Sequence, residues 1–560
     1  MGSAPTQAAP EHPPAAPTAL PGKVPQLVDI TAATGISFQH LSSPEQKYIV
    51  ESMGGGVALI DYDGDGWPDI YFTNAPSVSM TLAGKKAKSA LYHNNHDGTF
   101  TDVTDKAGVG YPCWAMGAAV GDYNNDGRPD LIVSCFGGVV LYRNNGDGTF
   151  TDVTKAAGLD KDTGWATGVA FGDYDGDGNS DLFVAHYVDL DLNDLPSFGS
   201  RKTCEYLGIA VQCGPRGLKG SPDTLYRNRG DGTFTEVAKQ SGVDDANRFF
   251  GLTAVWSDFD NDGKLDLIVA NDGGPNYLYR NLGNGHFQDV ALDGGVAVSE
   301  EGSEQANMGI AVGDYLNTGR MSILISHFSN EYATLYRNDG AMSFTDVSHA
   351  AGIAHATESY VGWGDAFLDL DNSGWLDIVL VNGHVYPQVD DTKAGLSYRE
   401  PKLVFQNRRD GTFINVSAQA GPAVSVPQVS RGLAVGDLFN KGRLNVVVEN
   451  LTGAPMILET KSNPAHHWVS FALEGSPANR LALNARIRIT TGKLQQLGEV
   501  RSGGSYLSQN DLRLHFGLGD AATIDKVEVS WPNGATQVFQ NLTADRFYHL
   551  KQGGAPTVAP

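Results

Sequence analysis

Short apolar runs and glycine-rich acidic turns alternate along most of the chain. Residues 57–60 and 70–72 are apolar, and they flank the turn Asp61-Tyr-Asp-Gly-Asp-Gly-Trp-Pro-Asp69. Two apolar runs of this length around a glycine-rich turn are typical of a β-hairpin. The pattern therefore predicts two strands, because the helix-flanked loop of an EF-hand would also need a glutamate at position 12.

The acidic turn recurs along the chain with oxygen-bearing residues at positions 1, 3, 5 and 9 and a glycine at position 6. Carboxylate and amide oxygens suit Ca²⁺, which takes six to eight oxygen ligands. Two further copies, which begin at Asp314 and Asp437, keep the shape but lose ligands. The spacing predicts about four or five calcium ions, bound by Asp61, Asp63, Asp65 and Asp69; Asp122, Asn124, Asp126 and Asp130; Asp173, Asp175, Asp177 and Asp181; Asp258, Asp260, Asp262 and Asp266; and Asp369, Asp371, Ser373 and Asp377.

Each acidic turn belongs to a longer repeat with a period of roughly 50 to 60 residues, which points to a propeller or an array. One unit reads as strand, acidic turn, strand, connection, a strand such as Leu-Tyr-Arg-Asn, a turn such as Asp-Gly-Thr-Phe, and a fourth strand. Four short strands per unit are typical of a propeller blade. Seven first halves but six second halves occur, and residues 26–31 match the missing fourth strand. We therefore expect an all-β fold with a seven-bladed propeller over residues 25–460, closed by the N-terminal strand.

The repeats resemble the FG-GAP, or VCBS-type, blades of integrin α-subunits and of many bacterial exported proteins, and the acidic turns carry this resemblance. Residues 461–553 resemble the ASPIC/UnbV domain through Ser505-Tyr-Leu-Ser-Gln-Asn510, His515-Phe-Gly-Leu-Gly519 and Trp531-Pro-Asn-Gly534. The usual Gly-Ala-Arg of that domain is Asn484-Ala-Arg486 here. The whole chain is similar to the cartilage acidic protein family, as a bacterial-type member. This similarity implies an integrin-like propeller and a small β-sandwich-like C-terminal domain. It says hardly anything about the activity of the protein.

Charge and cysteine content narrow the possible partners and compartments. A formal net charge of −24 argues against nucleic acid, and no apolar run approaches the roughly 18 residues of a membrane span. Cys204 and Cys213 are expected to form a disulfide, whereas Cys113 and Cys135 could form a second bridge or remain buried thiols. Calcium loops of low affinity are occupied at the roughly millimolar calcium concentration found outside cells, and not at cytosolic concentrations. We therefore expect a monomer that is secreted, extracellular or periplasmic.

The two ends of the chain have a different composition from the repeats. Residues 1–24 begin with Met-Gly-Ser and continue as an Ala/Pro-rich stretch, which is typical of a tag followed by a flexible tether. Residues 554–560 are expected to form a tail. A native signal peptide is not visible in this sequence.

Candidate ligand-binding residues gather at the ends of the second strands, on the face opposite the acidic turns. Polar groups rimmed by aromatic rings around a propeller mouth suit a ligand pocket. The alternative is that these amides and histidines satisfy backbone groups at strand ends and line a wet channel. The candidates are Asn74, Trp114, Trp165, His186, Asn271, His327, Asn382, His384 and Tyr386.

The preferred function is a binding or adhesion module for a protein or glycan on this face. The alternative is an enzyme, of the lyase, dehydratase or hydrolase kind, that acts on a carbohydrate or small polar substrate. Its candidate catalytic residues are His186, His327, Glu331 and His384, and the three histidines could bind a transition metal, although no short His-x-x-x-His spacing supports this. A purely structural scaffold is the third possibility.

Overall fold

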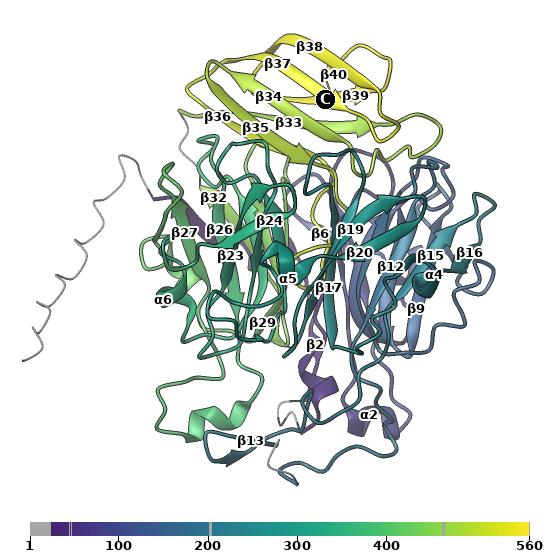
Figure 1. Ribbon diagram of the computed structural model, residues 1–560, viewed down its shortest axis with the longest axis vertical. Helices are drawn as coiled ribbons and strands as arrows, with labels where there is room; N and C mark the ends of the chain where they lie inside the picture. Colours follow the sequence, from purple (N-terminus) through teal and green to yellow (C-terminus); the bar gives the residue numbers. More distant parts are fainter. Residues whose placement is uncertain (1–23, 44, 46, 201–203, 462–464, 559–560) are drawn as a thin grey trace, which may run out of the picture.

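The computed structural model describes residues 24–558 apart from residues 44, 46, 201–203 and 462–464. The expected tag and tether, residues 1–24, therefore lies outside the described residues except for Val24. The protein is all-β and consists of a ring of four-stranded sheets with a smaller pair of sheets stacked on one end (Figure 1). No helix of the described residues is long and apolar enough to cross a membrane.

Seven four-stranded antiparallel sheets follow one another around the ring in the described part of the chain. In each hairpin of first and second strands, apolar side chains are buried on both faces, because every sheet packs between two others. Six sheets are formed by strands that are consecutive within the ring: β3 (Val57–Ile60), β4 (Asp69–Phe72), β5 (Ala90–Asn94), β6 (Phe100–Asp102); β7 (Trp114–Gly121), β8 (Asp130–Phe136), β9 (Gly138–Asn144), β10 (Phe150–Asp152); β11 (Ala166–Gly172), β12 (Asp181–His186), β15 (Thr224–Asn228), β16 (Phe234–Glu236); β17 (Gly251–Ser257), β18 (Asp266–Asn271), β19 (Tyr277–Gly283), β20 (His286–Asp289); β21 (Ile310–Gly313), β22 (Ser322–Ile325), β23 (Thr334–Gly340), β24 (Ser343–Asp346); and β25 (Gly362–Leu368), β26 (Asp377–Asn382), β27 (Leu403–Asn407), β28 (Phe413–Asn415).

The remaining sheet joins the two ends of the ring. Its order is β1-β32-β30-β29, with Gln26 opposite Lys461 and Asp29 opposite Leu458. The N-terminal strand thus completes the last sheet, as the sequence predicts. The first strand of each sheet contacts the first strand of the next, and β29 contacts β3, so the ring is closed without a free edge between its ends. The strands are β1 (Gln26–Asp29), β29 (Ser430–Gly436), β30 (Asn445–Asn450) and β32 (Met456–Lys461).

The C-terminal part is a pair of four-stranded sheets that enclose an apolar core with Phe471, Ile487 and Val527. Residues 554–560, expected as a tail, instead include a strand, β40, which pairs with β39 and covers its backbone edge. The sheets have the orders β36-β33-β39-β40 and β35-β34-β37-β38, with β33 (His467–Glu474), β34 (Arg486–Thr491), β35 (Leu494–Glu499), β36 (Leu514–Gly519), β37 (Thr523–Ser530), β38 (Thr536–Thr543), β39 (Arg546–Lys551) and β40 (Thr557–Val558).

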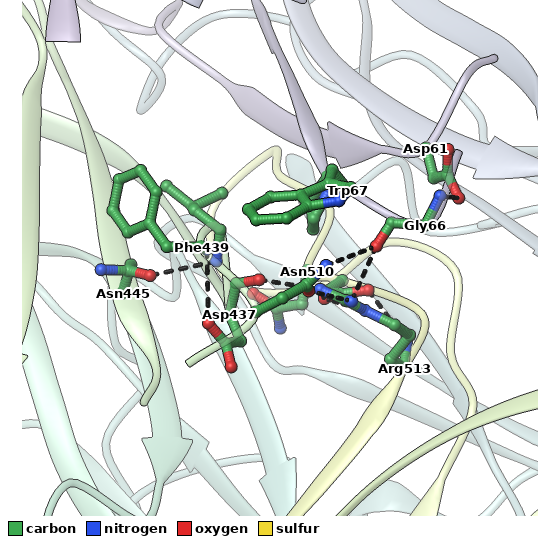
Figure 2. A network of polar contacts seen from close by, with 12 residues as sticks. Asp61, Gly66, Trp67, Asp437, Phe439, Asn445, Asn510 and Arg513 are labelled. Atoms are coloured by element: carbon green, nitrogen blue, oxygen red, sulfur yellow. Dashed lines mark hydrogen bonds and ion pairs between the residues drawn. The ribbon is translucent and has the colours of Figure 1, made fainter. Parts of the chain in front are cut away.

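The C-terminal part covers the end of the ring that carries the acidic turns. Arg513 donates hydrogen bonds to the carbonyl oxygens of Gly66 and Asp437, at 3.1 and 2.8 Å, and to Asn440 Oδ1 at 2.7 Å (Figure 2). Arg486 forms an ion pair with Asp258 at 3.3 Å. Basic side chains of one part therefore meet acidic turns of the other.

The connection between β35 and β36 enters the centre of the ring. We call residues 499–510 the axial segment, because they form hydrogen bonds with the first strand of every sheet in the ring. The hydrogen bonds include Leu59 N to Gln509 O, Ala118 N to Leu507 O, Phe171 N to Ser502 Oγ, Ser257 Oγ to Glu499 Oε2, Ile310 N to Ser505 O, Asp365 N to Ser505 Oγ and Val435 N to Asn510 Oδ1.

Glycines in the inner strands allow the axial segment to approach the ring. A Cβ atom on Gly56 would lie 2.2 Å from the carbonyl oxygen of Leu507, and one on Gly117 would lie 2.8 Å from the same atom. Real Cβ atoms essentially never come this close, so backbone and not only a side chain would have to shift.

The opposite end of the ring carries the longest connections, including the short strand β13 (Figure 1). The hairpin of β13 (Glu205–Tyr206) and β14 (Ile209–Ala210) is bridged by the Cys204–Cys213 disulfide, as expected, and Cys113 and Cys135 form the second disulfide. The remaining short elements are α1 (Thr31–Thr34), β2 (His40–Leu41), η1 (Ile49–Ser52), α2 (Val78–Leu82), α3 (Thr104–Ala107), α4 (Ala238–Ser241), α5 (Ala291–Gly294), α6 (Ala354–Thr357), η3 (Pro387–Asp391), α7 (Pro422–Ser425) and β31 (Thr452–Gly453).

Replacing Gly56 by alanine should destabilise the protein, because the added methyl group collides with the backbone of the axial segment. We expect the free energy of unfolding to fall by about 2 kcal/mol or more, as for other overpacked interiors. Chemical denaturation measures this change. Gly110→Ala is the control, since its Cβ would meet only the side chains of Thr104, Lys88 and Asp105. Equal stabilities of the two variants would contradict the close approach.

Candidate functional site

The first aspartate of each acidic turn organises the turn through backbone hydrogen bonds. Asp61 Oδ1 accepts from the N–H groups of Gly64 and Asp65, at 2.9 and 3.0 Å, and its Oδ2 accepts from Gly66 at 3.0 Å. The glycines adopt positive φ, which brings successive N–H groups onto one carboxylate. Burial, together with the nearby carboxylates of Asp65 and Asp63, raises the pKa of Asp61 to about 6.

The ninth residue of the turn has a structural role in addition to the predicted metal-binding role. Asp69 accepts from Asn94 N of the third strand at 2.8 Å and from Tyr62 N at 3.3 Å. Asn94 in turn donates to Leu438 O in the neighbouring sheet at 2.7 Å. The same pair of backbone bonds recurs at Asp130, Asp181, Asp266 and Asp377.

Four of the five predicted turns bring three or more possible ligand residues close enough to hold one metal ion. The ninth aspartate belongs to such a group in the first, third and fifth turns, whereas the fourth turn uses its positions 1, 3 and 5. The second turn is not among these groups; its Asn124 donates from Nδ2 to Asp126 at 2.9 Å. The groups are Asp61, Asp63 and Asp65; Asp63, Asp69 and His93; Asp173, Asp175 and Asp181; Asp258, Asp260 and Asp262; and Asp369, Asp371 and Asp377.

Basic side chains from the third strand reach several of these turns, which the sequence analysis missed. Arg227 pairs with Asp175 at 2.7 Å, and Arg280 pairs with Asp260 at 2.8 Å. In the first sheet His93 takes the place of the arginine and lies 3.2 Å from Asp69. The signal was present in the sequence, since the arginine recurs in the Leu-Tyr-Arg-Asn strand.

The fifth turn has no such basic partner in the described part of the chain. Burial raises the pKa of Asp369 and of Asp377 well above the usual range, and Asp371 adds to both shifts. Asp371 Oδ1 is buried without a hydrogen-bond partner. Three carboxylates around an unpartnered buried oxygen fit an oxygen-ligated cation, which would supply the missing positive charge.

A pocket of about 450 Å³ lies at the other end of the ring, near the axis. Its walls come from the connections that follow second strands and from the β13–β14 hairpin. Aromatic rings dominate the walls, and a few polar groups accompany them. The aromatic residues are Tyr187, Tyr206, Phe328, Trp363 and Tyr386, and the polar residues include Glu205, Gln212, Arg216, Asp272 and Glu331.

The rings of the pocket hold one another in place. Tyr206 lies 5.5 Å from both Phe328 and Tyr386, measured between ring centroids. Trp363 donates from its indole nitrogen to Gly383 O at 2.7 Å, and Tyr506 of the axial segment packs against its ring at 4.7 Å. The C-terminal part thus supports the pocket through the centre of the ring.

The predicted amide residues donate hydrogen bonds to backbone carbonyl oxygens of the connections. Asn271 donates to Pro275 O and Asn382 donates to Pro401 O, both at 2.7 Å. Asn74 donates to Gln39 O at 3.2 Å and accepts from Leu41 N. These contacts agree with the alternative reading, in which the amides satisfy backbone groups at strand ends.

The three candidate histidines lie in separate environments. His186 forms a 2.9 Å contact with Asp162, whereas His327 is fully buried and burial lowers its pKa to about 3. His384 is also buried, which lowers its pKa to about 3, and it packs against Tyr206. No group of possible metal ligands found in the described residues contains these histidines.

Other predicted residues fall partly inside and partly outside the pocket. Trp114 and Trp165 are buried in the apolar core near the mouth, whereas Tyr386 and Glu331 line the pocket. The sequence analysis missed Asp272 and Arg216, although Asp272 directly follows Asn271 at a strand end.

Comparison with known proteins agrees with this architecture. A model of the FG-GAP-like repeat matches residues 61–133, 122–184 and 258–325, and the ASPIC and UnbV model matches residues 475–557. Cartilage acidic protein 1 of Xenopus tropicalis is 22% identical, over 88% of this chain and 72% of its own length. The human protein of the same name is 23% identical, over 86% and 69%.

Solved structures are more distant. The Dos1 propeller has 10% identity and a TM-score of 0.36, over 79% of this chain and 96% of its own. An Agrocybe aegerita lectin that recognises non-reducing terminal N-acetylglucosamine has 17% identity and a TM-score of 0.36, over 72% and 87%. The chain combines FG-GAP repeats with a C-terminal ASPIC and UnbV domain, and it is homologous to cartilage acidic protein 1 over most of its length.

Proposed function

We propose that this protein is an exported, calcium-stabilised β-propeller that binds a protein or glycan at the end of the ring opposite the acidic turns. The pocket at that end carries the proposal. Ligand sites are typically concave, largely apolar and supplied with a few polar groups, and this pocket has that composition.

The arrangement of the two parts favours this end as the binding end. The C-terminal part lies over the acidic turns, through contacts such as Arg513 with Asp437 and Arg486 with Asp258. The axial segment fills the centre of the ring. A partner at this end therefore meets the side chains that line the pocket. The backbone of the long connections emerges at the same end of the ring (Figure 1).

Calcium is proposed as a structural cation of the acidic turns. The carboxylate groups at four turns and the unpartnered Asp371 Oδ1 support it. A cation bound to the folded form alone stabilises that form by mass action. Export is supported by the two disulfides, which persist in oxidising compartments. The enzyme alternative has less support, since the three histidines do not converge.

Replacing Tyr386 by alanine should remove binding to any partner of the pocket, because it takes away an aromatic wall. We expect affinity to fall about tenfold or more, as for truncation of central aromatic residues in other interfaces. Partners are first found by screening the wild-type protein on glycan arrays and extracellular-protein arrays, and dissociation constants are then measured by surface plasmon resonance.

Tyr111→Ala is the matched control, because Tyr111 is 53% exposed and does not line the pocket. Circular dichroism and thermal melting establish that both variants are folded. A partner that binds Tyr386→Ala as tightly as Tyr111→Ala does not use the pocket, and this result would argue against the proposed site.

Replacing Asp371 by asparagine should weaken cation binding at the fifth turn while keeping the shape of the side chain. Terbium luminescence excited through tryptophan reports on the first and fifth turns, since Trp67 and Trp375 are at position 7, and Asp371→Asn should remove only the part that comes from the fifth turn. We expect the protein to lose one equivalent of calcium by elemental analysis and to melt at lower temperature than the wild type in calcium, with little difference between them in EDTA.

Asp147→Asn is the control, because Asp147 is fully exposed and lies in a different turn, where its carboxylate accepts a hydrogen bond from Thr149 N. An unchanged calcium content and an unchanged melting temperature in Asp371→Asn would show that the fifth turn does not bind calcium. The proposed pocket would be unaffected by that outcome.

A further inference from the structure

The pocket has more acidic than basic side chains among its described lining residues. Glu205, Asp272 and Glu331 contribute carboxylates, and Arg216 contributes the one guanidinium. No ion pair within 4.0 Å joins Arg216 to either Asp272 or Glu331 in the described part of the chain. The lining residues of the pocket therefore carry an excess of negative charge, and the nearest further cation is the buried guanidinium of Arg431, which lies behind the wall at 3.9 Å from the ring centroid of Trp363.

Asp272 and Glu331 are held by neutral hydrogen-bond donors. The hydroxyl of Tyr187 donates to Asp272 Oδ2, and the N–H of Ala306 donates to Glu331 Oε2 at 2.9 Å. Burial raises the pKa of Glu331 to about 7, and the Asp272 carboxylate adds to the shift. Burial also raises the pKa of Asp272 to about 6. The two groups thus repel one another in a site that partly excludes water.

The rings beside these carboxylates offer a second source of attraction for positive charge. Tyr206, Phe328 and Tyr386 form a cluster with centroid separations of 5.5 to 6.0 Å. The face of an aromatic ring carries partial negative charge, and rings grouped around one space form the cages that recognise ammonium groups. A neutral sugar would gain from the rings but would leave the charge excess of the pocket unchanged.

Building on the binding function proposed above, we infer that the pocket takes a cationic group, an alkylated or primary ammonium, held between Asp272 and Glu331 and the rings of Tyr206, Phe328 and Tyr386. The bound cation provides positive charge in direct contact with the carboxylates of Asp272 and Glu331, which Arg216 does not contact directly. A lysine or methylated lysine side chain, or a small quaternary ammonium compound, has this chemistry.

Choline and its uncharged isostere 3,3-dimethylbutan-1-ol test the inference directly, because they differ in charge and hardly in shape. Isothermal titration calorimetry on the full chain at low ionic strength measures both, with methyl α-glucoside as the neutral sugar. We expect choline to bind at least about tenfold more tightly than the alcohol, in line with the strength of a desolvated cation–aromatic contact.

Charge variants of the pocket separate electrostatic recognition from shape. Glu331→Gln and Asp272→Asn should each weaken choline binding by about tenfold, as expected for loss of a partly buried charge partner. Arg216→Gln should strengthen it, because it removes the opposing charge. Asp97→Asn, an exposed carboxylate in a turn outside the pocket, should leave affinity unchanged.

The outcomes distinguish this inference from the broader function. Equal affinities for choline and the alcohol, or weaker choline binding by Arg216→Gln, would overturn it. Absence of choline binding alongside a neutral array partner that depends on Tyr386 would also overturn it, and would leave the binding function standing. The arrays could also yield no partner while choline binds in a way that depends on Tyr386 and Glu331. This result would support a cationic ligand and would overturn only the proposal that the partner is a protein or glycan.

Discussion

The hydrogen bonds between the axial segment and the inner strands are the constraint on which the architecture depends. The inner strands of a ring have one edge without a neighbouring strand, and their buried N–H groups need partners. Residues 499–510 satisfy such N–H groups in six sheets, with bonds such as Leu59 to Gln509 and Ile310 to Ser505, and in the remaining sheet they accept from the side-chain hydroxyl of Ser257. A ring without its C-terminal part would leave these groups to water, so the two parts stabilise each other through the axis and act as one folded unit.

The two ends of the ring differ because of charge. Acidic turns crowd carboxylates together at one end, and the structure balances them in two ways: third-strand basic residues such as Arg227 and Arg280, and C-terminal arginines such as Arg486. The fifth turn lacks the first of these, and its buried Asp371 oxygen is without a partner. Protein contacts that balance the carboxylates therefore cover the acidic end, whereas the other end has an open aromatic pocket.

Sequence reasoning succeeded where the structure is periodic and failed where it is not. The acidic turns, the four-strand unit and the completion of the last sheet by the N-terminal strand follow from repeated local patterns. The pocket comes from connections of unequal length, and the axial segment has no repeat to reveal its position. One signal was available: a glycine five residues before the first aspartate in six of the seven turns, including Gly56 and Gly117, which marks close backbone approach.

The axial segment also links the two ends chemically. Tyr506 donates its hydroxyl to Met53 O at 2.7 Å and packs on Trp363, and both Met53 and Trp363 line the pocket. The same segment begins at Glu499, whose carboxylate pairs with Arg486 beside the acidic turn of Asp258. A continuous path of buried contacts therefore runs from an acidic turn to the wall of the pocket. Because packed interiors transmit strain, these contacts make the acidic turn of Asp258 and the wall of the pocket parts of one connected interior.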